Sequence, residues 1–332
     1  MILENLNLFL FPLFTILILI SILGYGTLIN KILFTNEFEL RLKNLIFIQG
    51  LIFTGFFFII LNFFIPISNN SSLLLILVGI LIYVYFLFKK EKLIIELLFL
   101  LFVSLLSILY SFYSGFNDDF NYHYETIKNY KNKNLFEILH NRRISYNSHW
   151  LFLNSIYSLS FFTSTLVVLS SLFFSITIYD FVNLCKKTLK QGKYYLSIIS
   201  FFCLIFFLGA LNNLKEFGTD IPGVIVSIYI ILLITNKFIE KSKEPTENIF
   251  LISLLFLQFA FIIKISNFLV ILFLFLLVLK IKYRKLNFFL FLVICLIPIP
   301  WFFQNYIISG CLIWPISITC FSTTDLAIKE IN

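Results

Sequence analysis

Two short segments of this chain gather acidic side chains directly after long apolar runs. Asp118 and Asp119 follow the fourth apolar run of the chain. Glu216 and Asp220 lie in a later polar stretch, NNLKEFGTDIPG. A carboxylate at a membrane–water boundary can accept a proton from a hydroxyl group or bind a divalent cation, for which Asp118 and Asp220 are the candidate ligands. The alternative roles are a helix cap at Asn117 or Asp118 and a cap or dipole contact at Asp220. We expect the two clusters to form one catalytic site.

Basic and titratable side chains supply the complementary chemistry. Lys264 stands between two apolar runs with no acid nearby in the sequence, and an ionisable residue at membrane depth is a functional hypothesis by default. Arg142 and Arg143 are adjacent, and a guanidinium group binds phosphate at two points. Snorkelling of Lys264 and contacts with anionic head groups are the alternatives. We expect these three residues and His123, which titrates near neutrality, to bind substrate.

These residues are separated by apolar segments that are long enough to cross a bilayer. The 332 residues are 60% hydrophobic and only 13% charged, whereas a soluble domain is nearer half apolar and a quarter charged. Apolar runs of about 18 residues or more span the hydrocarbon core as helices. The sequence therefore predicts an all-α integral membrane protein with about ten transmembrane helices. The predicted spans are residues 8–33, 44–66, 72–88, 93–112, 162–184, 194–211, 221–236, 249–263, 265–280 and 287–307.

The longest polar segment, residues 113–149, follows the fourth predicted span. Long loops in compact proteins are usually functional or disordered, and the aromatic residues and helical patterning after Asp119 argue against disorder. We expect a long outer loop that carries short interfacial helices. The apolar stretch 149–161 follows this polar loop, and we expect it at the interface as well.

The positive charge of the chain follows the predicted topology. The formal net charge is +8, and its Lys and Arg residues cluster between the apolar runs. Every odd-numbered loop holds three or more bases, whereas the short even-numbered loops hold one or none. By the positive-inside rule the odd loops are cytoplasmic, and both termini and the loop 113–149 lie outside. This distribution explains the charge without nucleic acid, and the sequence contains no Rossmann glycine fingerprint, P-loop or zinc-ligand spacing.

The five cysteines form no CxxC motif. Cys203 and Cys295 lie inside apolar runs, where isolated thiols are expected. Cys311 and Cys320 flank a proline near the C-terminus, and they pair if that side of the membrane is oxidising.

Taken together, these features resemble the GT-C class of membrane glycosyltransferases. Members of that class have an acidic motif in an outer loop just after a membrane span, often with a second acid from the next outer loop. The resemblance implies a sugar donor carried on a polyprenyl phosphate or diphosphate. Carried over by position, Asp118 or Asp119 would be the catalytic or metal-binding acid and Asp220, or else Glu216, the second acid. Lys264 would meet the lipid phosphate.

A closer likeness is to an uncharacterised family of bacterial multi-spanning membrane proteins often found among surface-polysaccharide genes. Its motifs cover most of the chain from Asp118 onward, and their shared order is the stronger signal. The matching stretches are DDFNYHYETIK, LHNRRISYNSHW, GTDIP, IKISNFLVILF, PWFFQNYIISGCLIWP and TTDLAIKE. One position departs from the pattern, because Gln304 stands where an arginine is expected before Asn305. This departure argues against a phosphate contact at Gln304.

The resemblance implies a glycosyltransferase on the outer face of the bacterial inner membrane. It would move a sugar from a polyprenyl-linked donor to an acceptor in surface polysaccharide or glycan assembly, with a divalent cation such as Mg²⁺ or Mn²⁺ as the expected cofactor. Residues 1–92 would be additional transmembrane helices, and residues 93–332 the GT-C-like core. The alternatives are a transporter or flippase for a lipid-linked or anionic substrate, and a non-catalytic assembly protein. No nucleic-acid partner is expected.

Overall fold

The computed structural model describes residues 2–34, 42–89, 93–112, 123–138, 148–159, 168–209, 218–239, 246–279, 286–313 and 316–321. Within these ranges the chain forms α-helices and short 3₁₀ helices and no β-strand. The long helices are α1 (Ile2–Leu33), α2 (Lys43–Asn62), α3 (Asn69–Leu87), α4 (Leu93–Phe112), α7 (Val168–Lys190), α8 (Tyr194–Gly209), α9 (Asp220–Phe238) and α10 (Thr246–Ile263). The shorter helices are α5 (Tyr124–Asn132), η2 (Leu135–Glu137), α6 (His149–Tyr157), η5 (Ile265–Val270), α11 (Ile271–Val278), α12 (Phe288–Leu296), α13 (Ile299–Ser309) and η7 (Ser317–Thr319).

The helices confirm an all-α, multi-pass membrane protein. Among the described residues, seven helical segments are long and apolar enough to cross a membrane: Pro12–Leu33, Lys43–Asn62, Asn69–Leu87, Val168–Lys190, Asp220–Phe238, Thr246–Ile263 and Phe288–Ser309. Three shorter apolar segments, Glu96–Ser107, Tyr194–Gly209 and Ile265–Val278, coincide with the other predicted spans. α4 as a whole has 20 residues, which is enough to cross, whereas Tyr194–Gly209 and Ile265–Val278 are shorter than a bilayer usually requires. These two reach across only if polar flanks snorkel or the bilayer thins.

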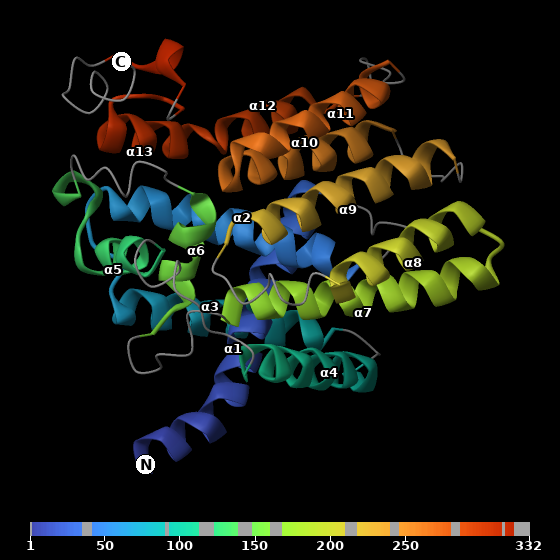
Figure 1. Ribbon diagram of the computed structural model, residues 1–332, viewed down its shortest axis with the longest axis horizontal. Coiled ribbons are helices and arrows are strands. Elements are labelled where there is room, and N and C mark those ends of the chain that lie inside the picture. The colour runs from blue at the N-terminus through green and yellow to red at the C-terminus, as the bar shows by residue number, and fades with distance from the viewer. Residues whose placement is uncertain are drawn as a thin grey trace.

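The ends of the bundle differ in character. In Figure 1, α5, α6, the start of α1 and the end of α13 all lie toward the left, and the turn between α7 and α8 lies at the far right. This turn is basic, with Lys187, Lys190 and Lys193. The basic turn and the helices of the long polar loop therefore occupy opposite ends, as the charge pattern predicts.

Glycine allows α1, α2 and α3 to pack with their backbones in close contact. A Cβ on Gly24 would lie 2.0 Å from the carbonyl oxygen of Gly79, and a Cβ on Gly50 would lie 2.1 Å from that of Ile22. Only residues without a side chain permit this approach, which is a recurrent way for membrane helices to gain packing contacts. The three helices therefore form one tightly packed unit.

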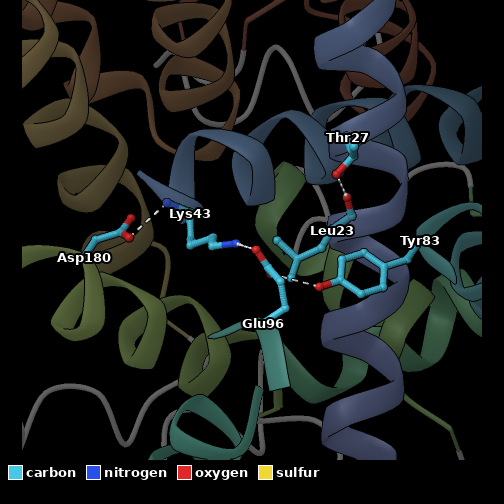
Figure 2. A network of polar contacts seen from close by, with 6 residues as sticks. All are labelled: Leu23, Thr27, Lys43, Tyr83, Glu96 and Asp180. Atoms are coloured by element: carbon cyan, nitrogen blue, oxygen red, sulfur yellow. Dashed lines mark hydrogen bonds and ion pairs between the residues drawn. The ribbon is translucent and has the colours of Figure 1, made fainter. Parts of the chain in front are cut away.

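A buried carboxylate on α7 caps the start of α2. Asp180 accepts hydrogen bonds from the backbone N–H groups of Lys43 (2.9 Å) and Asn44 (2.8 Å), and from the hydroxyl of Tyr229 on α9 (3.0 Å). The first N–H groups of a helix have no partner within the helix, and the helix N-terminus attracts negative charge. Asp180 therefore ties α2, α7 and α9 together at one point, and Figure 2 shows its contact with Lys43 of α2.

The side chain of Lys43 extends the same network to α3 and α4. Its Nζ lies 2.5 Å from a carboxylate oxygen of Glu96, and the hydroxyl of Tyr83 donates to the other oxygen at 3.1 Å (Figure 2). On α1, the hydroxyl of Thr27 donates to the carbonyl of Leu23 one turn back, as the figure also shows. The charges of Lys43 and Glu96 are thus paired where the helices meet.

The helix α6 corrects one expectation. The stretch that begins at His149 was expected to lie on the membrane surface, where an amphipathic helix keeps one face exposed. All nine residues of α6 are instead buried within the protein, against α2, α5, α7 and α10. The helix has no solvent-facing side because protein surrounds it, and its polar residues His149, Asn154 and Ser155 are buried with the apolar ones. The other helices of this loop fit the expectation better, since α5 exposes Tyr124 at its surface.

The first helices also pack against later ones. α1 contacts α4 and α7, and α2 contacts α6, α7 and α13. The division of the chain into residues 1–92 and 93–332 remains a prediction. α2, from the first part, packs directly against α6 of the second part.

Candidate functional site

Two residues that the sequence singled out lie in contact. The ammonium group of Lys264, just after α10, forms an ion pair with the carboxylate of Asp220, the first residue of α9. The pair is solvent-accessible, with 43% of the Lys264 side chain and 69% of the Asp220 side chain exposed. The chain brings them together across 44 residues. Asp220 is not the N-cap of α9, because Thr219 occupies that position, and Lys264 is the N-cap residue of η5 without a capping hydrogen bond from its side chain.

The helix termini favour this arrangement. A negative charge is favourable at the start of a helix and a positive charge at its end. The dipole of α9 therefore stabilises the charge of Asp220, and the dipole of α10 stabilises the charge of Lys264. The neighbouring contacts are close: a Cβ on Gly223 would lie 2.0 Å from Nδ2 of Asn267, which in turn donates to the carbonyl of Ala260 at 3.1 Å. Glycine at position 223 therefore lets α9 approach η5.

The N-terminus of α6 joins the same group of elements. The hydroxyl of Ser148 caps α6 by accepting from the N–H of Trp150 at 3.2 Å, and it donates to the carbonyl of Ile263 at 2.8 Å. Because Ile263 precedes Lys264, this hydrogen bond places the start of α6 beside the Asp220–Lys264 pair. The residue after Ser148 is His149.

A narrow cleft opens next to His149. Its walls come from α2, α6, α10 and the junction between α12 and α13. Among the described residues the lining is uncharged, and most of it is apolar: Ile52, Phe56, Ile59, His149, Leu255, Gln258, Phe259, Ile262, Ile297, Pro298 and Trp301. The free space between these side chains is about 10 Å³, which is room for about one water molecule.

The polar groups of the cleft are incompletely satisfied. Nδ1 of His149 and Oε1 of Gln258 are buried without a hydrogen-bond partner in the described part of the chain. The imidazole stacks on Phe152 (ring centroids 5.8 Å apart) and meets the edge or face of Phe259 (5.9 Å). α6 lies outside the candidate spans, and burial lowers the pKa of His149 to about 3, so its side chain is a neutral hydrogen-bonding group.

Of the remaining predicted site residues, the structure describes His123 alone. His123 directly precedes α5 and is half-buried. The other candidates lie outside the described residues: Asp118, Asp119, Arg142, Arg143 and Glu216. The helix expected to begin near Asp119 is described from Tyr124 onward as α5.

The outer loop is anchored through α5. The N–H of Ile67, in the turn between α2 and α3, donates to the carbonyl of Tyr130 at 3.0 Å. Nζ of Lys131 donates to Oδ1 of Asn69 at 2.8 Å, and burial lowers the pKa of this lysine to about 8. These contacts hold α5 against the same end of the bundle as α6.

The described residues do not by themselves fit a divalent cation. Within the described ranges no three His, Cys, Asp or Glu side chains gather in a possible metal site. Asp220, the one described carboxylate proposed as a ligand, is paired with the ammonium group of Lys264. A cation site that includes Asp220 would therefore need this ion pair to open.

Sequence reasoning missed three buried polar residues, Glu96, His149 and Asp180, and the half-buried Gln258. A signal was available for two of them, because Glu96 and Asp180 fall inside predicted spans, where ionisable residues are rare and usually paired or functional. His149 and Gln258 carry no such signal. Their importance arises only from the cleft that four separate elements build around them.

The two C-terminal cysteines are joined. Cys311 and Cys320 form a disulfide that closes a short turn after α13, as the sequence predicted for an oxidising side, whereas Cys185, Cys203 and Cys295 are free. The N–H of Leu312 donates to the carbonyl of Thr319 (3.0 Å) next to the bond. Disulfides persist in oxidising compartments, so the bond is compatible with the outer location that the charge pattern predicts for the C-terminus, and that location stays a prediction.

We expect a maleimide–polyethylene glycol reagent to add three groups to the denatured protein before reduction and five after reduction, since three of the five cysteines are free. A gel shift measures the number of groups. The Cys311→Ser, Cys320→Ser double variant serves as the control and should add three under both conditions. Five additions to the unreduced wild-type protein from intact cells would contradict the assignment of this turn to the oxidising side.

Comparison with known proteins identifies the family. No curated protein and no solved structure matches the chain significantly. The family described as "Domain of unknown function (DUF8201)" matches residues 8–329, which is nearly the whole chain. The match includes the Asp220–Lys264 pair, the cleft beside His149 and all of α1–α3 from residue 8 onward, so it does not separate an N-terminal part from a core. The chain belongs to the DUF8201 family.

Proposed function

We propose that the protein is a GT-C-like glycosyltransferase that crosses the bacterial inner membrane about ten times. It would use a sugar on a polyprenyl phosphate or diphosphate and transfer it to an acceptor on the outer face. The observation that carries this proposal is the contact between Asp220 and Lys264. It joins a candidate acid and a candidate phosphate-binding base from separate helices, next to a cleft at the outer-loop end of the bundle.

The proposed reaction assigns a role to each charge. The bond between the sugar's anomeric carbon and the donor phosphate oxygen breaks, and the phosphate takes the electron pair. The ammonium group of Lys264 stabilises the negative charge that grows on this phosphate. The acceptor oxygen bonds to the anomeric carbon and gives its proton to a carboxylate, for which Asp118 or Asp119 is proposed.

The resting ion pair fits these roles. While no donor is bound, Asp220 accompanies the charge of Lys264, and an incoming phosphate would compete for the same ammonium group. An exposed ion pair contributes roughly 0–1 kcal/mol, so opening it costs little. Asp220 would then be free to act as the second acid. The roles above belong to side chains alone, since the described residues by themselves do not form a cation site.

The test is transfer of label from a lipid-linked donor to an acceptor in sealed, right-side-out membrane vesicles. We expect Lys264→Gln to reduce transfer about 100-fold, which is typical for losing one group that stabilises the transition-state charge. Lys264→Arg should recover a substantial part because it keeps the charge. Lys193→Gln, in the basic turn at the opposite end, is the matched control and should transfer normally.

The acidic cluster provides the second half of the test. Replacing both Asp118 and Asp119 by Asn should abolish transfer while the protein still inserts in the membrane. Wild-type activity in this double variant, or equal labelling in vesicles that lack the protein, would sink the glycosyltransferase proposal. Uptake or flipping of the labelled lipid without glycosylation of an acceptor would instead support a transporter.

Transport of a lipid-linked or anionic substrate is the second candidate because the tenth span is interrupted. α12 ends at Leu296 and α13 begins at Ile299, with Pro298 in the turn between them. Discontinuous membrane helices often line the substrate sites of transporters. The same interruption contributes Ile297 and Pro298 to the lining of the cleft beside His149.

A further inference from the structure

A disulfide-closed turn follows α13, and we call it the cysteine turn. It comprises residues 310–321, of which the structure describes 310–313 and 316–321. The bond between Cys311 and Cys320 joins its two ends. The glycosyltransferase proposed above gives this turn no role, so its surface requires an explanation of its own.

The backbone of the cysteine turn pairs many of its own polar groups. The N–H of Phe321 donates to the carbonyl of Gly310 at 3.1 Å, and the N–H of Leu312 donates to that of Thr319 at 3.0 Å. Further N–H groups that donate to carbonyls within the turn are those of Ile316, Thr319 and Cys320. Backbone groups that contact hydrocarbon must be paired within the protein. These hydrogen bonds therefore suit the turn to contact with lipid.

Large apolar side chains dominate the surface of the turn. Ile318 is 88% exposed and Phe321 is 70% exposed, and Leu312 and Ile316 are exposed to 37% and 39%. Apolar area that stays in water forgoes the stabilisation that burial provides. An exposed cluster of apolar residues usually marks a contact with a membrane or with another protein.

The absence of charge favours the membrane as the partner. Between residues 286 and 324 the sequence contains no Asp, Glu, Lys, Arg or His. The candidate span Phe288–Ser309 accounts for 22 of these residues, which is enough to cross a bilayer, so the uncharged stretch continues beyond the span and includes the whole cysteine turn. A protein–protein interface has a polar rim around its apolar centre, and this stretch supplies no charged side chain for one.

The lipid-facing surface of α12 and α13 leads directly to the turn. On these two helices, exposed side chains recur every three or four positions, at Leu292, Leu296, Ile299, Phe303 and Tyr306. This spacing gives each helix one continuous exposed side within a candidate membrane span. Tyr306 lies one turn before Gly310, and tyrosine is enriched where a span reaches the membrane–water boundary. The cysteine turn therefore begins at that boundary.

The position of the turn beside the bundle agrees with this location. In Figure 1 the helices α7–α10 run across the view, and the red ribbon after α13 stands above α13, on the side away from α2 and α5. The ribbon does not extend past the left end of the bundle, where α5 lies. The turn is thus displaced sideways from the bundle, into the region that lipid occupies around a membrane protein.

We propose that the cysteine turn is an interfacial anchor that inserts Ile318 and Phe321 into the lipid leaflet on the side where α13 ends. Apolar groups of interfacial segments typically reach about 5–10 Å into the boundary between head groups and acyl chains. The disulfide holds the turn in one conformation, so less conformational freedom is lost on insertion. The anchor does not depend on the transfer reaction and applies equally to a transporter.

The test places a tryptophan in the turn and measures its contact with lipid. The parent is the full chain with Trp314→Phe, to which Ile318→Trp or Phe321→Trp is added, in nanodiscs that leave both membrane faces open to water. Bromine atoms on lipids quench tryptophan fluorescence on contact, and iodide quenches it from water. We expect lipids brominated near the head group to reduce the added fluorescence and iodide to leave it unchanged. Lipids brominated near the chain ends should quench less, because the insertion is shallow.

Two further probe positions calibrate the measurement. Leu272 is 68% exposed in the middle of the apolar segment Ile265–Val278, so Leu272→Trp should be quenched most by bromine near the chain ends. Lys128 lies on the exposed side of α5, so Lys128→Trp should be quenched by iodide and not by lipid. The probes in the turn replace exposed residues, and elution from a size-exclusion column like that of the parent checks that each variant is folded.

Each outcome decides the proposal. Quenching by lipid at position 318 supports the anchor, and position 321 decides if Ile318→Trp does not fold. Quenching by iodide alone places the turn in water and overturns it. A probe that neither lipid nor iodide reaches places the turn in a protein contact, for instance with a second copy of the chain, and overturns it as well. The assay contains no sugar donor, so its result is separate from that of the transfer assay.

Discussion

Replacing Asp180 by alanine is expected to lower the free energy of unfolding by about 3–5 kcal/mol, the range for removing one partner from a buried charged contact. The substitution leaves two backbone N–H groups, those of Lys43 and Asn44, and the hydroxyl of Tyr229 without their acceptor. Asp180 is 3% exposed, so water does not replace the lost oxygen atoms. Thermal unfolding of the detergent-solubilised protein, followed by size-exclusion chromatography, measures the change.

Two further variants make this prediction specific. Asp180→Asn keeps one acceptor oxygen but turns the other position into a donor, so it should be destabilised by less than the alanine variant. Asp220→Ala removes an exposed carboxylate from the first turn of another helix and should change stability by less than about 1 kcal/mol. Equal stability of Asp180→Ala and the wild-type protein would show that the cap contributes nothing.

Adding a single methyl group at Gly24 is expected to disrupt the packing of α1 against α3. The Cβ of Gly24→Ala would lie 2.0 Å from the carbonyl oxygen of Gly79 and 3.0 Å from the backbone nitrogen of Tyr83. Backbone atoms in a helix cannot rotate away, so the helices must separate, and overpacking of this kind costs typically about 1–3 kcal/mol or more. The same measurement of thermal unfolding and the yield of monodisperse protein detect the effect.

Helix propensity alone predicts the opposite effect, namely that replacing glycine by alanine stabilises a helix. Alanine favours a helix over glycine by about 1 kcal/mol, so a glycine without close neighbours should tolerate the change or gain from it. Gly209, at the end of α8, has open space around its Cβ position and is the matched control. If Gly24→Ala and Gly209→Ala behave alike, α1 and α3 do not pack as described.

Apolar run length predicted the order and placement of the long helices well, since only a helix satisfies the backbone inside lipid. The boundaries were less accurate because helices end at specific residues and not where apolarity ends. α7 was predicted at 162–184 but is described from Val168 to Lys190, and it continues through polar residues until Gly192 turns with a φ of 71°. α2 ends at Asn62, before Pro66, although apolar residues continue.

The candidate site could be predicted only in part. Asp220 and Lys264 were recognisable as charges next to apolar runs, but nothing in the sequence pairs residues 44 positions apart. Asp180 and Glu96 interrupt predicted spans and were open to the same reasoning as Lys264. The burial of His149 depends on a glycine at position 55, where a Cβ would lie 2.2 Å from Nε2 of the imidazole, and on aromatic rings from α6 and α10. Such a meeting of distant elements leaves no local pattern.

The cap on α2 also affects the order of events while the chain is synthesised. Asp180 follows Lys43 by 137 residues, so the ribosome completes α2 long before it makes the carboxylate that caps it. At typical elongation rates of about 5–20 residues per second, the interval is roughly 7–27 s. Throughout that interval the first turn of α2 must keep its N–H groups in contact with water or the insertion machinery. The first turn of α2 therefore acquires its capping carboxylate only when α7 has been made and has packed against it.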